Sequence, residues 1–185
     1  MSKRRRLNRE TVIQQAAAMA DEAGSVSAVH LSALARALNV QPPSLYNHVD
    51  GLEDLRYSLA VHGLRQLLVE LRQASLGLVG REALMAVAFA YRRFAHNHPG
   101  LYPLVIRAPE PDEVELVALS QELLQMLLLL MASQGLQDDD ALHAIRGLRA
   151  VLHGFVSLET AGGFKMALDQ DESFERLVGG YLTTL

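Results

Sequence analysis

The stretch of sequence that decides the fold is residues 31–49, which read LSALARALNVQPPSLYNHV. Apolar residues recur at helical spacing on both sides of Asn39, a residue type that accepts the left-handed backbone of a tight turn. Pro43 suits the first turn of a second helix, because the N–H that proline lacks has no intrahelical partner there. Two helices this short cannot bury their apolar faces alone, so the preceding helix must supply a third wall. The pattern predicts a helix-turn-helix.

The second helix of this motif would present short or planar hydrogen-bonding side chains, which suit phosphates and base edges in the major groove. Asn47 could pair with adenine through its amide, whereas Ser44 and Tyr46 would hold phosphate oxygens. An ordinary helical hairpin with a polar surface is the alternative. The predicted DNA-contacting residues of this segment are Gln41, Pro42, Pro43, Ser44, Tyr46, Asn47 and His48.

The charge of the chain is distributed unevenly. The formal net charge is −4, yet residues 1–50 carry six Lys/Arg against four acids, and the remaining residues carry eleven against seventeen. A basic end on an acidic body directs a polyanion toward the N-terminus, although a solvated tail gives the same composition. We therefore add the N-terminal arm to the predicted DNA contacts: Lys3, Arg4, Arg5 and Arg6.

Bulk properties exclude several classes of protein. The chain has no cysteine, which excludes disulfides and thiolate metal sites. No segment reaches the roughly 18 uninterrupted apolar residues of a membrane span, and the basic N-terminus leads into Asn8, Arg9 and Glu10 rather than a signal-peptide core. We expect a soluble, cytoplasmic protein without a membrane segment.

The periodicity is helical throughout, which predicts an all-α fold of about nine helices. Asn8 is a plausible N-cap and Gly24 a plausible C-terminal stop of the first helix. Asp50 and Glu53 have the spacing of a capping box at the start of a long helix that continues to about Gln73. Further helices are predicted over residues 81–97, 112–134, 139–160 and 171–183.

The string VQPPSLYNHV at residues 40–49, preceded by LARAL and followed by LEDL, resembles the head of the TetR (tetracycline-repressor-like) family over about residues 8–72. The resemblance implies a dimeric regulator with a three-helix DNA-binding head, a long fourth helix and a ligand-binding helical bundle. We therefore expect a helix-turn-helix domain with its basic arm at residues 1–50, and a ligand-binding and dimerisation domain at residues 51–185.

Two positions depart from the TetR pattern. Members often carry a phosphate-binding lysine at the start of the fourth helix, and residues 50–52 contain none. A hydroxyl is commonly found where this chain has Leu31, and Ser32 or His30 would have to substitute; we include Ser32 among the DNA contacts. Phosphate affinity would then depend on the arm and on Arg9.

A second stretch of resemblance lies in the C-terminal half, at residues 94–104, 152–159 and 163–164. It is similar to a TetR C-terminal subclass named for a Trp-His-Gly string. Leu152 replaces the tryptophan, so only His153 and Gly154 match.

The last two helices carry apolar stripes that suit a two-fold four-helix interface, although both could pack inside one protomer. The predicted interface residues are Leu148, Leu152, Phe155, Phe174, Leu177, Val178 and Tyr181. A small-molecule pocket between body helices is plausible, with an apolar or aromatic effector. Its candidate lining residues could equally be core: Met85, Phe89, Phe94, Tyr102, Met126, Met131 and Phe155.

Metal and enzyme chemistry have little support in the sequence. His96 and His98 are not a same-face helical pair, and His62, His143 and His153 lie far apart in sequence. No nucleophile–base spacing, glycine-rich phosphate loop or HExxH string is present. We predict no metal, no cofactor and no catalysis. The leading hypothesis is a homodimeric repressor released from operator DNA by an effector; the alternative is a helical sensor or interaction protein with weak or lost DNA binding.

Overall fold

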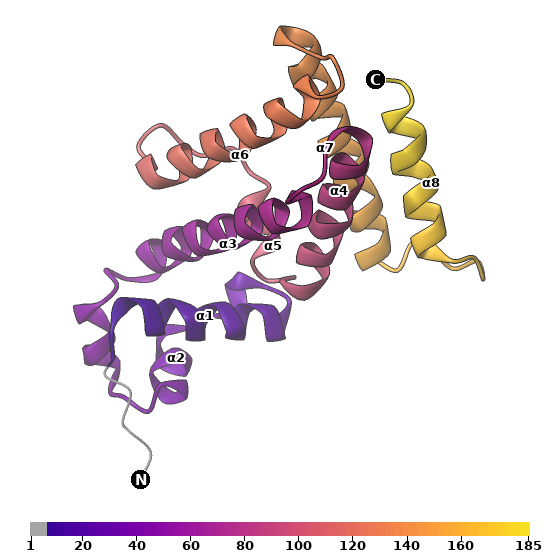
Figure 1. The fold of residues 1–185 in the computed structure, drawn as a ribbon. Helices are drawn as coiled ribbons and strands as arrows, with labels where there is room; N and C mark the ends of the chain where they lie inside the picture. Colours follow the sequence, from indigo (N-terminus) through magenta and orange to yellow (C-terminus); the bar gives the residue numbers. More distant parts are fainter. Residues whose placement is uncertain (1–6) are drawn as a thin grey trace. The chain divides into compact units, whose positions relative to one another are not determined.

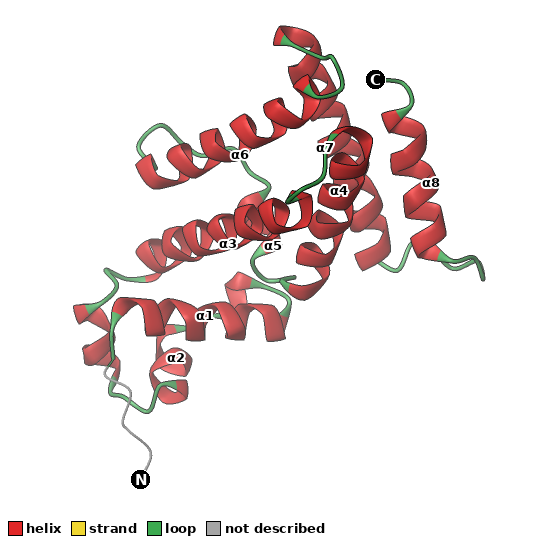
Figure 2. Cartoon of the chain, viewed as in Figure 1, coloured by secondary structure: helices red, strands yellow, loops and turns green. Residues whose placement is uncertain are grey.

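A computed structural model describes residues 7–185, so Lys3, Arg4, Arg5 and Arg6 lie outside the described residues. The described chain folds into helices and loops without a strand (Figure 2), and the predicted all-α class is confirmed. The α-helices of this part of the chain are α1 (Arg9–Ala23), α2 (Leu31–Ala37), α3 (Leu52–Ser75), α4 (Gly80–Asn97), α5 (Tyr102–Val105), α6 (Val114–Ala132), α7 (Asp138–Thr160) and α8 (Gln170–Leu182) (Figure 1). Two 3-10 helices are η1 (Val26–Ala28) and η2 (Pro42–Asn47).

The described chain divides into two compact units, each with its own core. The head unit contains the described residues up to Arg65 together with Asn97–Leu116, and the body unit contains Gln66–His96 together with Val117–Leu185. The chain therefore passes between the units after residues 65, 96 and 116. Helices α3 and α6 each contribute to both units.

Local sequence signals set the ends of α1, as predicted. The side chain of Asn8 accepts a hydrogen bond from the Thr11 amide at 2.7 Å, and Gly24 ends the helix with a left-handed φ of 64°. The buried face of α1 packs into a core shared with α2, η2 and the start of α3. The fully buried members of that core are Val12, Ala16, Ala20, Leu34, Ala35, Leu45, Leu59 and Leu101.

The turn of the helix-turn-helix falls at Asn39, whose φ of 54° confirms the predicted left-handed position. The second helix of the motif starts at Pro42 rather than Pro43 and is a 3-10 helix rather than an α-helix. The adjacent prolines favour this, because Pro43 disfavours the α conformation of the residue before it.

The start of α3 differs from the predicted capping box. The amide of Asp50 donates to the carboxylate of Asp54 at 2.9 Å, whereas Glu53 pairs with Arg56 at 3.1 Å. The acid that reaches back is thus one residue later than predicted. Asp54 is held there by Arg9 of α1, a partner 45 residues away that helix-capping rules do not include.

The segment after α4 packs into the head unit. Helix α4 ends at Asn97, as the His98-Pro-Gly sequence predicts, and the following turn lies against α1. A Cβ added to Gly100 would overlap the backbone carbonyl of Ala20, so only glycine allows this approach. Leu101 is fully buried in the head core. The head unit is consequently assembled from two separated parts of the chain.

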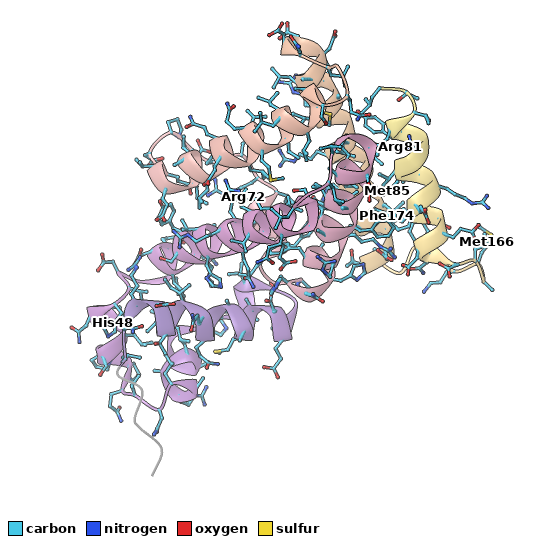
Figure 3. All side chains as sticks on the ribbon, viewed as in Figure 1. His48, Arg72, Arg81, Met85, Met166 and Phe174 are labelled. Atoms are coloured by element: carbon cyan, nitrogen blue, oxygen red, sulfur yellow. The ribbon has the colours of Figure 1, made fainter. Side chains whose placement is uncertain are left out.

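In the body unit, α8 packs on α4 and α7. The hydroxyl of Tyr181 donates to the carbonyl of Ala144 at 2.7 Å, and Arg81 donates to the carbonyl of Gly179 at 2.7 Å. Figure 3 labels Arg81, Met85 and Phe174 where α4 and α8 meet. Edge-to-face contacts join Phe174 to rings on both neighbouring helices and add to the burial energy of this core.

Helix α6 is long and apolar enough to cross a membrane by length and composition, with a mean hydropathy of 1.6 over its best window. Such composition is shared by membrane spans and by core helices of soluble proteins. Only 17% of that window is buried within the described structure. Two of its acids form ion pairs with α3, Glu115 with Arg65 and Glu122 with Arg72.

Candidate nucleic-acid interface and effector pocket

The predicted recognition residues lie together on one exposed segment of the head unit. Leu45 and Val49 are buried and anchor η2 to the head core. The polar side chains between and before these anchors face solvent, with Tyr46 58% exposed. Gln41, Pro42, Pro43 and Asn47 are exposed, Ser44 and His48 are half-buried, and Ser32 is exposed in the first turn of α2. Such a surface can offer amide, hydroxyl and imidazole groups to DNA.

Arg9 occupies a different place from the one the sequence suggested. Its guanidinium donates to Asp54, Ser58 and the carbonyl of His48, within the head unit. Its hydrogen bond holds the pKa of Asp54 below the ordinary value, against the opposing effect of burial. The Arg9 side chain is 47% exposed, but both of its terminal nitrogens donate to acceptors of the head unit, so the predicted phosphate role of Arg9 is not supported by its geometry.

The first turn of α3 is acidic and apolar where TetR proteins often carry a lysine. Leu52 is 40% exposed, and Glu53 and Asp54 follow it. Negative charge near a DNA-facing segment opposes the approach of phosphates.

The body unit contains six of the seven predicted ligand-binding residues, and Tyr102 belongs to the head unit. Three of these six residues are buried in the body unit: Phe94, Met131 and Phe155. Tyr102 is buried in the head unit. The other members of the set, Met85, Phe89 and Met126, are half-buried. Phe89 and Phe155 both contact the ring of Phe174, with centroids 5.2 and 5.1 Å apart. Such burial agrees with the alternative that these residues form the core. Their contact with a ligand remains a prediction.

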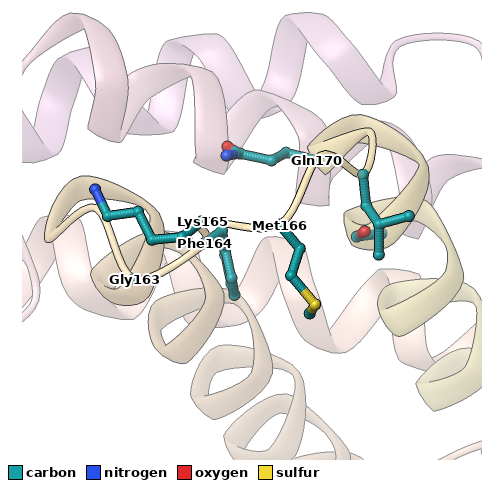
Figure 4. Close-up of a pocket in the computed structure, with 7 residues that line it drawn as sticks. Gly163, Phe164, Lys165, Met166 and Gln170 are labelled. Carbon is teal, nitrogen blue, oxygen red and sulfur yellow. The ribbon is translucent and has the colours of Figure 1, made fainter.

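A pocket of about 370 Å³ opens where the chain passes from α7 to α8 (Figure 4). Its lining is largely apolar with one ammonium group, and consists of Gly163, Phe164, Lys165, Met166, Leu168, Gln170 and Ser173. The ring of Phe164 packs on Phe155, with ring centroids 4.8 Å apart. The pocket therefore adjoins the aromatic cluster of the body unit, which consists of Phe89, Phe155 and Phe174. Met166 and Leu168 are 79% and 67% exposed. Their exposure is the feature that sequence reading missed, because these residues lie in a loop without periodicity.

A buried ionic cluster lies beside the same aromatic rings. Arg92 forms two hydrogen bonds with Glu159, at 3.0 and 2.6 Å, and one with Asp171 at 2.7 Å. Its guanidinium also lies 4.9 Å from the ring centroid of Phe174. His96 contacts the same Glu159 carboxylate at 2.7 Å. Burial raises the pKa of Glu159, but the hydrogen bonds from Arg92 and His96 outweigh it and lower the pKa overall.

The predicted dimer stripes face the protomer core. Leu148, Leu152, Phe155, Phe174 and Val178 are buried within the protomer, and the Tyr181 hydroxyl bonds to Ala144. Leu177 is 42% exposed. The surface that α7 and α8 leave for a partner is therefore the opposite, exposed face, where Gly154, Leu158, Leu177 and Gly180 lie.

The sequence matches known proteins over its whole length. It is 35% identical to the HTH-type transcriptional regulator YobS of Bacillus subtilis (strain 168), over 100% of this chain and 96% of that protein. It is 34% identical to the HTH-type transcriptional regulator Rv0681 of Mycobacterium tuberculosis (strain ATCC 25618 / H37Rv), over 94% of this chain and 79% of that one.

The fold is shared with a solved tetracycline-repressor structure. A variant of TetR from Acinetobacter baumannii AYE, solved in complex with minocycline, is 21% identical and covers 97% of this chain and 96% of that one, with a TM-score of 0.67. Residues 84–181 match the family model of the tetracyclin repressor-like C-terminal domain.

These similarities and the helix-turn-helix head define a transcriptional regulator. The chain belongs to the TetR family. Membership of the Trp-His-Gly subclass remains a prediction.

We predict that Glu159→Gln destabilises the protein by about 3 kcal/mol at pH 7, because it leaves the buried Arg92 without its main counter-charge. A carboxyl with a lowered folded-state pKa adds stability above its unfolded pKa, near 4.5, and loses it as the pH falls through the folded value. The difference between wild type and variant, measured by urea unfolding, should therefore shrink below about pH 4.

Asp171→Asn is the control, because that side chain is 80% exposed. It should cost less than about 1 kcal/mol. Equal losses of unfolding free energy in the two variants would contradict the role of Glu159 as the main counter-charge of Arg92. A difference between wild type and Glu159→Gln that does not change with pH would contradict it as well.

Proposed function

We propose that this TetR-family regulator is a homodimeric repressor that binds a palindromic operator through η2 and releases it when a small molecule binds the body unit. The observation that carries the proposal is that Gln41, Tyr46 and Asn47 are exposed on and beside η2, while the buried Leu45 and Val49 anchor the segment. A short helix fixed in this way can insert side chains into a major groove while its apolar face keeps it on the head core.

Individual roles follow from side-chain chemistry. The amide of Asn47 can donate to and accept from adenine in a bidentate pair, and Tyr46 and Ser44 can bond phosphate oxygens. The arm from Lys3 to Arg6, outside the described residues, supplies cations that the first turn of α3 lacks.

We predict that Asn47→Ala weakens binding to the DNA upstream of the protein's own gene by about 10- to 100-fold, because each bidentate base contact contributes about 1–3 kcal/mol of discrimination. Affinity for unrelated DNA should stay unchanged. Electrophoretic mobility shifts across a salt series measure both quantities.

Asn97→Ala is the matched control, an exposed asparagine of the head unit at the end of α4. Absence of specific wild-type binding at low ionic strength would instead support the second candidate, a helical sensor with weak DNA binding. The acidic first turn of α3 is the observation that favours that candidate.

We further propose that two copies pair through the exposed faces of α7 and α8. Gly154 and Gly180 are helical, and a Cβ added at either would meet nothing within 4 Å in the protomer. Glycine inside a helix costs about 1 kcal/mol relative to alanine, so the protomer alone gives no reason for it. A partner helix at close approach supplies one, and Leu158 and Leu177 beside these glycines offer apolar contact.

We predict that Gly154→Leu raises the dimer dissociation constant by at least about thirtyfold, because overpacking costs about 1–3 kcal/mol at each of the two symmetry-related sites. Circular dichroism of the protomer should not change, since the new side chain has open space there. Sedimentation analysis measures the association.

Ala118→Leu, an exposed small residue of α6, is the control. A variant with Gly154→Leu that dimerises as tightly as wild type places the interface elsewhere.

The effector site that we propose is the pocket between α7 and α8. Its apolar lining, its ammonium group and its contact with the aromatic cluster favour a compound with an apolar or aromatic body and an anionic group. The minocycline complex of the Acinetobacter baumannii TetR variant supports small-molecule binding by this fold. Release of DNA requires that the compound bind the DNA-free conformation more tightly than the DNA-bound one.

We predict that the anionic aromatic dye anilinonaphthalene sulfonate binds the pocket with increased fluorescence, and that Leu168→Asp lowers its affinity about tenfold or more through like-charge repulsion and lost apolar contact. Fluorescence titration measures it. Leu76→Asp is the control, because Leu76 is 84% exposed and lies outside the pocket lining. An equal loss in both variants would show that the dye binds elsewhere.

No cofactor or catalytic step is part of this proposal, and we place the protein in the cytoplasm, where its DNA target lies.

A further inference from the structure

A single guanidinium joins three elements of the head unit. Arg9, the first residue of α1, donates from Nη1 to the carbonyl of His48 at 2.5 Å and to Asp54 at 3.0 Å. Its Nη2 donates to the other carboxylate oxygen of Asp54 at 2.6 Å and to Ser58 at 2.7 Å. His48, labelled in Figure 3, is the residue that ends η2. The guanidinium therefore connects α1 and α3 to the end of residues 42–48, which we call the recognition segment.

The acceptors around this guanidinium have further contacts within the head unit. One Asp54 oxygen also accepts from the amide of Asp50, which follows the recognition segment. Ser58 is only 5% exposed, so its hydroxyl lies within the packed unit. Two parallel N–H···O bonds between a guanidinium and a carboxylate fix direction as well as distance, which an ammonium cannot do.

The recognition segment begins with two prolines and consists largely of the 3-10 helix η2. Pro42 and Pro43 donate no backbone hydrogen bond. Beyond them, Ser44 donates to the carbonyl of Gln41, and the amides of His48 and Val49 both donate to the carbonyl of Leu45. A six-residue 3-10 helix with this pattern has weak internal support, because 3-10 hydrogen bonds have poorer geometry than α-helical ones.

We infer that Arg9 is a positioning residue, which fixes the end of η2 for base recognition through Asp54 and the His48 carbonyl, and is not a ligand of DNA phosphate. The inference rests on the proposed DNA-binding function. It adds a residue outside the recognition segment on which the specificity of that segment depends.

Two variants separate positioning from phosphate contact. Arg9→Lys keeps the positive charge but loses the two-pronged hydrogen bonding, so a phosphate ligand would lose affinity for specific and unrelated DNA alike, whereas a positioning residue would lose only specific affinity. Asp54→Asn removes an acid near the DNA-facing segment, which electrostatics alone predicts to strengthen binding. Glu53→Gln is the matched control, since it removes the same charge from the adjacent residue, whose carboxylate pairs with Arg56.

We expect Arg9→Lys and Asp54→Asn each to weaken specific binding to the upstream DNA by about tenfold or more, with affinity for unrelated DNA of equal length unchanged in Arg9→Lys. Glu53→Gln should keep or slightly increase both affinities. Measurements are made well below the melting temperature, where a residue that only stabilised the fold would alter neither affinity. Specific affinity that is unchanged in Arg9→Lys overturns the inference.

Hydrogen–deuterium exchange tests the same inference without DNA. Peptides covering residues 42–50 should exchange faster in Arg9→Lys and Asp54→Asn than in wild type and Glu53→Gln, while α1 stays protected. If wild type fails to bind its upstream DNA, the proposed function fails and the exchange result still decides the role of Arg9. Unchanged exchange over residues 42–50 in both variants overturns it.

Discussion

The head unit depends on one carboxylate, that of Asp21 near the end of α1. It accepts from the His98 ring at 2.7 Å and from the amides of Gly100 and Leu101 at 3.1 and 3.2 Å. These bonds hold the turn after α4 so close to α1 that no side chain fits at residue 100. Leu101 thereby enters the core on which η2 is packed. A displacement of this turn must either move α1 with it or break three hydrogen bonds.

The parts of the fold that sequence predicted correctly are those whose causes are local. Asn8, Gly24 and Asn39 each define a helix end or a turn through their own backbone preferences and nearest neighbours. Apolar periodicity located the long helices to within about two residues, because a buried face repeats along the chain itself. The polar surface of η2 was also legible, since the buried Leu45 and Val49 determine which side chains remain outside.

What the sequence could not provide was the pairing of residues distant in the chain. Arg9 was counted as a phosphate ligand because its partner Asp54 lies 45 residues away. Arg92 and Glu159 are separated by 67 residues, and composition does not tell which acid a cation meets. The apolar stripes of α7 and α8 were visible, but a stripe fits a protomer core and a dimer interface equally well. Only packing distinguishes them, and it directs Phe174 and Val178 inward.

The discontinuous assembly of the head unit has a consequence for the engineering of chimeric regulators. Head segments of modular proteins are often exchanged by joining one N-terminal fragment to another body at a single splice point. Here a fragment cut before α4 would lack Leu101 and the turn held by Asp21, and would expose apolar surface that the intact core covers. A hybrid that keeps this head therefore has to import residues 97–116 as a second insert.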